Sequence, residues 1–199
     1  GFFRRIWRPR RLLAAGGPPP GPLVLLAPAE GPGSEIARLL AAGGGPVFLA
    51  TPGPAFAVQG PHRLQLDPGQ AEDFRRLCAW VAQQAGPPAA FVHLWSIPPS
   101  PQAPPSAEAL EAAQPLGGAS LLALLGVLEH QSETLGRSPL SCTSKQTFLI
   151  DSPGPSKSEG PAPMLLVVTR QAQPVTPGEP VDAAAGPLLG LLATLGQER

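Results

Sequence analysis

The residues most suggestive of chemistry are the glycines of the stretch 31–36, which reads GPGSEI. This stretch follows the apolar run 23–27, and a glycine turn between a strand and a helix is where α/β proteins hold dinucleotide phosphates. The dinucleotide-binding fingerprint also needs a third Gly or Ala, and an acid about 20 residues further on. Here Ile36 and Thr51 stand in those places. The pattern predicts a turn without its ligand contacts, in which the branched Ile36 holds the helix away from the strand.

The residue types that a reductase would need are missing. The chain contains no tyrosine and no asparagine. A short-chain reductase uses a Tyr as proton donor, with a Lys four residues on to lower its pKa from about 10. No such pair can be drawn here, and the sequence has no G-x-S-x-G nucleophile motif.

The remaining candidate residues favour structural roles. Cys78 could be a reactive thiol and His93 a general base, but for both residues the favoured interpretation is a place in the hydrophobic core. Cys142 lies near Lys145 in a loop that offers no fixed geometry. We place the following polar residues on the surface: His62, His130, Glu108 and Glu111. We therefore expect no catalytic, cofactor-binding or metal-binding residue.

Composition narrows the class of protein. The 14 basic and 14 acidic residues give zero net charge, which argues against a nucleic-acid or anionic-membrane partner. Five arginines lie within 4–11, and the favoured interpretation is that this segment contacts a neighbouring domain. The 29 prolines and 23 glycines are typical of disorder, but the 43% hydrophobic content favours a folded chain. The two cysteines have unrelated surroundings, and free thiols are typical of a reducing cytoplasm. Pro and Gly interrupt the apolar stretches 12–29 and 112–128, so no membrane span is expected.

The candidate residues must be positioned by the strands and helices around them. The sequence predicts apolar strands that alternate with helices, and therefore one α/β domain over 1–199 with a mostly parallel sheet. Asp67 and Ser34 are the expected N-caps of two of the helices, and 51–61 is expected to be loop. The segment 136–163 is predicted to be a flexible insert. The expected strands are 2–8, 23–27, 46–50, 62–66, 89–95 and 164–170, and the expected helices start at 34 and 67 or span 107–114, 119–135 and 182–196.

Three stretches taken together resemble the structural subdomain of polyketide synthase ketoreductases. They are FRRIWRP near the start, FVHLWSI at 91–97, and the strand-turn-helix sequence of 165–198. The resemblance covers nearly the whole chain in order. It departs from the family pattern in the insert 136–163 and in the missing Trp of the last helix.

The resemblance implies a truncated Rossmann-like half that binds no NADPH and carries no catalytic residue. Such a half braces the ketoreductase catalytic half, or adjoins a methyltransferase, dehydratase or enoyl reductase. NADPH and phosphopantetheine would bind elsewhere in a cytoplasmic polyketide synthase, and the chain alone would not be an enzyme. Three alternatives stay open: a pseudo-ketoreductase, the structural half of an active NADPH-dependent β-ketoacyl reductase whose catalytic half lies beyond Arg199, and a free-standing proline-rich interaction adaptor.

Overall fold

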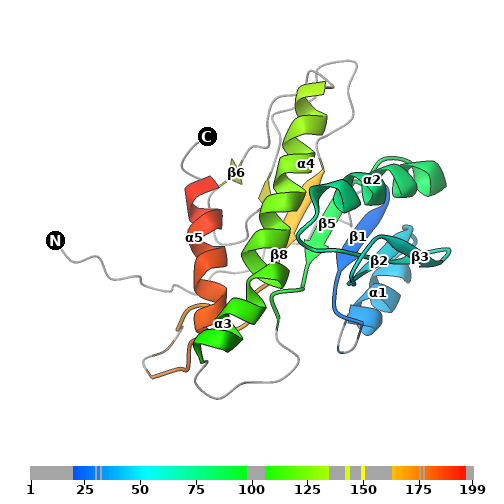
Figure 1. The fold of residues 1–199 in the computed structure, drawn as a ribbon. Helices are drawn as coiled ribbons and strands as arrows, with labels where there is room; N and C mark the ends of the chain where they lie inside the picture. The colour runs from blue at the N-terminus through cyan, green and yellow to red at the C-terminus, as the bar shows by residue number, and fades with distance from the viewer. Residues whose placement is uncertain are drawn as a thin grey trace.

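The computed structural model of the chain contains a six-stranded sheet flanked by helices (Figure 1). It describes residues 20–29, 31, 33–97, 106–134, 142–143, 149–150, 163–174, 176 and 178–195. The expected N-terminal strand 2–8 and most of the insert 136–163 lie outside these residues. The strands of the sheet are β1 (Leu23–Leu26), β2 (Val47–Pro52), β3 (Ala57–Gly60), β4 (Arg63–Leu66), β5 (Ala90–His93) and β8 (Met164–Val167).

The order of strands in the sheet is β3-β4-β2-β1-β5-β8. All neighbouring pairs are parallel except β3 and β4, which are antiparallel. Without the edge strand β3, the parallel strands follow the chain order 3-2-1-4-5, which is the arrangement of a Rossmann-like sheet. The predicted α/β fold class is confirmed.

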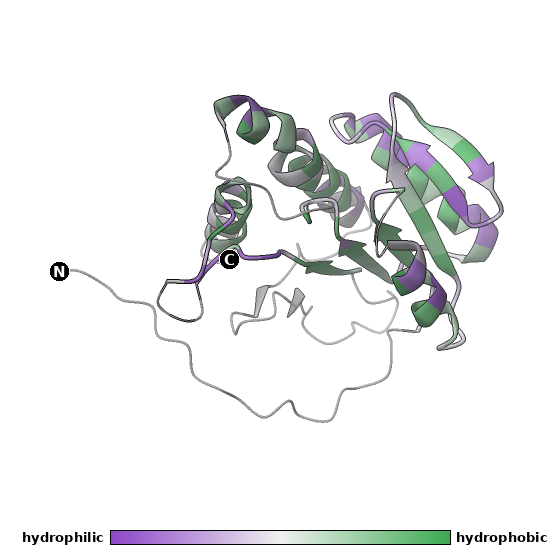
Figure 2. Ribbon diagram, turned by 90° about the horizontal axis from the view of Figure 1, so that it is seen from below, coloured by the Kyte–Doolittle hydropathy of each residue, from purple (hydrophilic) through white to green (hydrophobic). Residues whose placement is uncertain are grey.

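Helices cover both faces of the sheet. They are α1 (Gly33–Ala41), α2 (Ala71–Ala85), α3 (Ala107–Ala113), the π-helical turn η1 (Pro115–Ala119), α4 (Ser120–Thr134), the 3-10 turn η2 (Ala183–Ala185) and α5 (Gly186–Leu195). Side chains alternate along β1, so that Val24 and Leu26 join a core with α2, α4 and α5, while Leu23 and Leu25 face α1. Figure 2 shows hydrophobic residues along the middle strands and along the helices beside them.

Three expectations about loops and caps were wrong. The stretch 51–61 is not all loop, because Ala57–Gly60 forms β3 at the edge of the sheet. Its residues are mostly exposed, so no buried hydrophobic pattern marks this strand in the sequence. Asp67 does not cap α2, which begins at Ala71; its carboxylate accepts the N–H of Gly69 in the turn before the helix, at 2.9 Å. Ser34 lies inside α1, which begins one residue earlier.

The break expected at Pro115 and Gly117 is a π-helical turn rather than an interruption. This turn joins α3 to α4, and the described stretch Ala107–Gln131 is one continuous helix. By length and composition alone this stretch could cross a membrane, which the sequence did not lead us to expect. Leu121, Leu124 and Leu128 of α4 are nevertheless buried in the core beneath the sheet, so the helix has an inner face that packs in this fold.

Two short strands lie in the region of the insert. Cys142–Thr143 (β6) and Leu149–Ile150 (β7) pair antiparallel as a separate two-stranded sheet. The other residues of the predicted insert 136–163 lie outside those that the structure describes, apart from Pro163.

Candidate functional site

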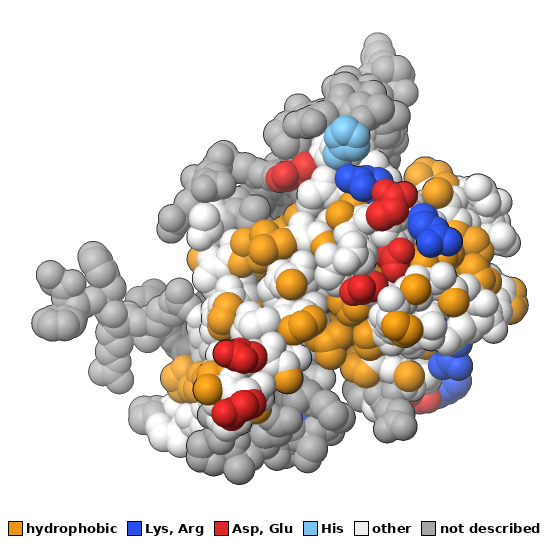
Figure 3. All heavy atoms as spheres, viewed as in Figure 1, with side chains coloured by type: hydrophobic (Ala, Val, Ile, Leu, Met, Phe, Trp, Pro, Cys, Tyr) orange, Lys and Arg blue, Asp and Glu red, His pale blue; other side chains and the backbone are white. Residues whose placement is uncertain are grey.

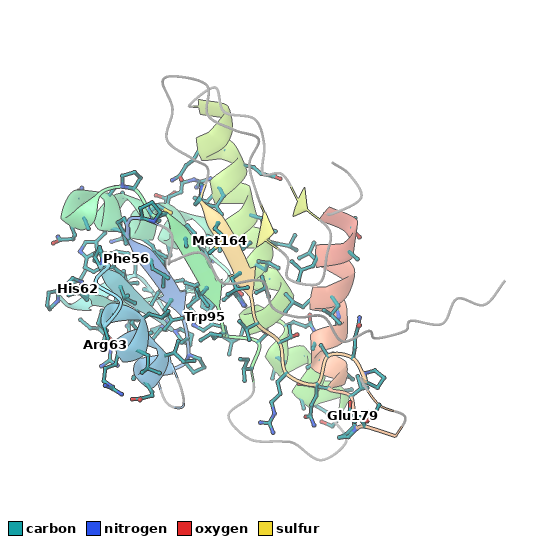
Figure 4. All side chains as sticks on the ribbon, turned by 180° about the vertical axis from the view of Figure 1, so that it is seen from behind. Phe56, His62, Arg63, Trp95, Met164 and Glu179 are labelled. Carbon is teal, nitrogen blue, oxygen red and sulfur yellow. The ribbon has the colours of Figure 1, made fainter. Side chains whose placement is uncertain are left out.

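The place to look for a ligand is the carboxyl end of β1 and β5. The strand order reverses between these two strands, and open α/β sheets bind ligands in the crevice at such a point. The turn that leads into α1 follows β1, and the loop 94–97 follows β5. Trp95, in that loop, lies near the middle of the molecule (Figure 4).

Both glycines of the turn have a structural reason to be glycine. Gly31 has a φ of +100°, in a region that side chains rarely adopt. At Gly33, a Cβ atom would lie 2.5 Å from the Cβ of Ala27, so only glycine lets the start of α1 approach β1 this closely. In the fingerprint a later glycine supplies this contact between helix and strand.

Ile36 does not keep the helix away from the strand, contrary to expectation. The close approach is made one turn earlier, at Gly33. Ile36 is half-buried and packs with Leu40 against the apolar side chains of the α1 face of the sheet. The place of the third glycine is thus taken by an ordinary core contact.

Thr51, at the place of the ribose-binding acid, is turned toward the sheet. It is 4% exposed, and its hydroxyl donates a hydrogen bond to the carbonyl oxygen of Leu64 at 3.2 Å. A carboxylate in α2 also accepts a hydrogen bond from the backbone. Asp73, in the first turn of α2, accepts the backbone N–H of Asp67 at 2.9 Å, which closes the connection from β4 to α2.

His93 lies in the core, as predicted. It is 0% exposed, and its Nε2 lies 2.9 Å from the Oγ of Ser120. The Ser120 hydroxyl lies 3.0 Å from the carbonyl oxygens of Leu116 and Gly117, to which it donates, so the histidine donates through Nε2–H. Burial lowers the pKa of His93 to about 4. The neutral imidazole links β5 to the first residue of α4.

Nδ1 of His93 and Nε1 of Trp95 have no hydrogen-bond partner among the described protein atoms. The two rings meet edge to face with their centroids 5.9 Å apart. On its other side Trp95 packs against Phe74 of α2, with centroids 6.1 Å apart. Aromatic packing therefore occupies the space beyond the end of β5, on the α2 side of the sheet.

The other candidates are dispersed. Cys78 is buried in α2, and burial raises its pKa to about 11, so the thiol stays protonated and belongs to the core as predicted. Exposed positions hold His62, His130, Glu108 and Glu111. Cys142 lies in β6 of the two-stranded sheet, and Lys145 lies outside the described residues. Within the described part of the chain no group of three His, Cys, Asp or Glu residues could hold a metal ion.

Comparisons with known proteins bear on the fold. No protein-family model and no curated protein sequence matches the chain. It is similar to a solved structure described as the adenylation, ketoreductase and pseudo-Asub multidomain structure of a keto acid-selecting NRPS module. That match has a TM-score of 0.69 and 18% identity over 97% of this chain and 14% of that one. A second match, an N-terminal ketoreductase from the macrolactin assembly line, has a TM-score of 0.49 and 15% identity over 61% of this chain and 25% of that one.

The likeness to the first of these structures supports the resemblance found in the sequence. The chain has a Rossmann-like fold of the ketoreductase type, and it spans a small part of the long synthase chain that it resembles. At 18% identity the likeness shows the fold alone.

Proposed function

We propose that the chain is a non-catalytic structural subdomain of a synthase module that assembles polyketides. It braces the ketoreductase catalytic half, or a neighbouring methyltransferase, dehydratase or enoyl reductase. The observation that carries this proposal is the start of α1, where Ile36, at the place of the fingerprint's third glycine, packs into the core.

Further features of the same edge support a role without chemistry. Thr51 is bonded to the strand beside it, and the chain has no tyrosine to donate a proton. In this proposal the chain alone is not an enzyme and binds no cofactor. NADPH and phosphopantetheine bind elsewhere in the parent protein, which works in the cytoplasm.

A second candidate is the structural half of an active NADPH-dependent β-ketoacyl reductase. The likeness to a solved module that includes a ketoreductase favours it. This candidate shares the bracing role and differs in that the ketoreductase half that is braced is an active enzyme. A Tyr-x-x-x-Lys pair and an intact glycine-rich turn in the rest of the polypeptide would indicate an active reductase, and their loss a pseudo-ketoreductase.

Bracing is tested in the full-length polypeptide that contains this chain. Leu25 lies in the central strand at 0% exposure, so Leu25→Asp buries a charge and unfolds this subdomain. A braced neighbour then melts at a lower temperature in calorimetry. The control Leu39→Asp, at a residue that is 57% exposed, leaves the melting of both parts unchanged. A neighbour whose melting is unaffected by Leu25→Asp would refute the bracing role.

A further inference from the structure

The π-helical turn η1 joins two helices that are held in different ways. α4 is anchored from within, since Leu121, Leu124 and Leu128 lie in the core. Each of the seven residues of α3 is instead half-buried or exposed, and the main contacts of α3 are with η1 and η2 rather than with the sheet. Figure 1 shows α3 at the lower end of α4, and in Figure 3 acidic side chains lie at the surface over it. An element that buries so little shifts or opens at a low cost in free energy.

The backbone of η1 departs from the hydrogen-bond pattern of an α-helix. The N–H of Ala119 donates to the carbonyl oxygen of Gln114, five residues back, at 3.2 Å. The N–H of Gly117 donates to the same oxygen, also at 3.2 Å. The N–H of Ser120 is shared between the carbonyl oxygens of Gly117 and Pro115. Shared donors and acceptors replace the regular ladder here, and sharp bends in helices are found at such turns.

The two adjacent glycines of η1 are not required by packing. A Cβ atom at Gly117 would meet nothing within 4 Å, and one at Gly118 would meet only the side-chain oxygen of Gln114, at 3.8 Å. Neither glycine has a positive φ. Alanine would fit at either position and is the better helix former, so what glycine adds in this turn is freedom of the backbone.

A buried side chain fixes the end of the turn that leads into α4. The Oγ of Ser120 lies 3.0 Å from the carbonyl oxygens of Leu116 and Gly117. It also lies 2.9 Å from Nε2 of His93, in β5, and both side chains are 0% exposed. Serine hydroxyls that bond to carbonyls three or four residues back are associated with bends in helices. The hydroxyl of Ser120 therefore ties this end of η1 to the sheet.

We propose that η1 is a hinge, about which α3 moves as a rigid helix while the bond between Ser120 and His93 holds the start of α4 against β5. The glycines take up the change in backbone angles, as hinge residues at the ends of elements do. The movement displaces the exposed carboxylates of Glu108 and Glu111 relative to the end of β5, and it leaves the core unchanged. This inference does not depend on the proposed function.

Distances between spin labels test the hinge in the full-length polypeptide that contains this chain. A nitroxide is attached to p-acetylphenylalanine at Glu108 of α3 and at Glu72 of α2, two exposed positions. The matched pair joins Glu72 to Leu122 of α4, which is 56% exposed. Double electron–electron resonance gives the distribution of each distance. We expect the distribution from Glu108 to be roughly twice as wide as that from Leu122, because α3 moves and α4 does not. Equal widths would overturn the hinge.

Alanine at the two glycines provides a second readout. Gly117→Ala combined with Gly118→Ala should narrow the distribution from position 108 to about the width seen from position 122, because alanine favours a single helical backbone. Gly126→Ala should leave that distribution unchanged, since this exposed glycine lies within α4 and its added Cβ would meet nothing within 4 Å. If the double variant has no effect, or if Gly126→Ala narrows the distribution equally, the hinge is refuted.

The role of Ser120 is measured with the same labels. Ser120→Ala removes the tie to His93 and should widen the distribution from position 108. The control is Thr194→Ala in α5, which removes an exposed hydroxyl that donates to the carbonyl oxygen of Gly190 at 3.0 Å. This control should leave the distribution as in wild type. A distribution that Ser120→Ala does not widen would contradict the proposal that this hydroxyl holds the fixed side of the hinge.

Discussion

At the scale of single residues, three buried polar side chains form hydrogen bonds within the fold. His93 is tied to Ser120 and packs against the ring of Trp95 at the end of β5. Thr51 and Asp73 bond to the backbone of the neighbouring segment. Each of these polar groups links two segments of the chain, so substituting it should change the free energy of unfolding.

Protonation of His93 should destabilise the folded protein. Its pKa falls from 6.5 to about 4 on folding, because burial penalises the charged form. Between these pH values the unfolded chain binds the proton and the folded chain does not. This contribution is therefore complete above pH 6.5 and is lost as the pH falls toward 4, by about 3 kcal/mol in all.

Urea unfolding at pH 7 and pH 5 measures this effect. His93→Leu should reduce the loss of stability between the two pH values by about 2 kcal/mol, because 1.5 pH units below the unfolded pKa no longer count. Leu39→Gln, at an exposed leucine that does not titrate, should keep the wild-type difference. Identical pH dependence in wild type and His93→Leu would contradict the buried neutral imidazole.

Gly33→Ala should destabilise the protein by about 1–3 kcal/mol, because the added Cβ would lie 2.5 Å from the Cβ of Ala27. Gly126→Ala provides the matched control within α4, since its Cβ would meet nothing within 4 Å. That control should be neutral or stabilising by up to about 1 kcal/mol. Chemical denaturation checks both, and equal effects would mean that α1 does not approach β1 closely.

At the scale of elements, the connection from β4 to α2 depends on a carboxylate inside the helix. Asp73 accepts the N–H of Asp67 and is 8% exposed. Asp73→Ala leaves that backbone donor without its partner and should cost about 1–2 kcal/mol. Glu72→Ala removes only an exposed ion pair with Arg75 and should change stability by less than about 0.5 kcal/mol. Equal effects of the two in urea unfolding would contradict this assignment.

The buried elements could be predicted from the sequence because their pattern is strong. The continuous apolar runs of β1, β2, β5 and β8 and the apolar stripe of α2 each indicate the right element. β3 could not be found, because an exposed edge strand buries too little to show a pattern. The cap of α2 was misplaced because Asp67 and Pro68 form a turn before the helix, and the π-helical turn was read as a break at its proline and glycines.

The site itself was predictable in part. The sequence shows that a third glycine and an acid are missing at Ile36 and Thr51. It does not show that Gly33 supplies the close contact with β1, because that contact depends on where α1 crosses the strand. The partnership of His93 with Ser120 is equally hidden, since 27 residues separate them.

At the scale of the whole molecule, the sheet has the strand order of a nucleotide-binding fold, while Ile36 and Thr51 stand where the fingerprint has its third glycine and its acid. A subdomain of this kind can contribute rigidity to a larger assembly without a ligand of its own. For this chain, Ile36 and Thr51 at the fingerprint positions predict that no dinucleotide binds beside β1.

Titration of the purified chain with NADPH, followed by thermal unfolding, tests the central claim most directly. A ligand at 100 times its Kd stabilises a folded protein by about 2.7 kcal/mol, a shift that is easily measured. We predict that the melting temperature stays unchanged up to millimolar NADPH. A concentration-dependent rise that Gly31→Val abolishes would show that the turn after β1 holds the coenzyme, and would contradict the account of this chain as a brace.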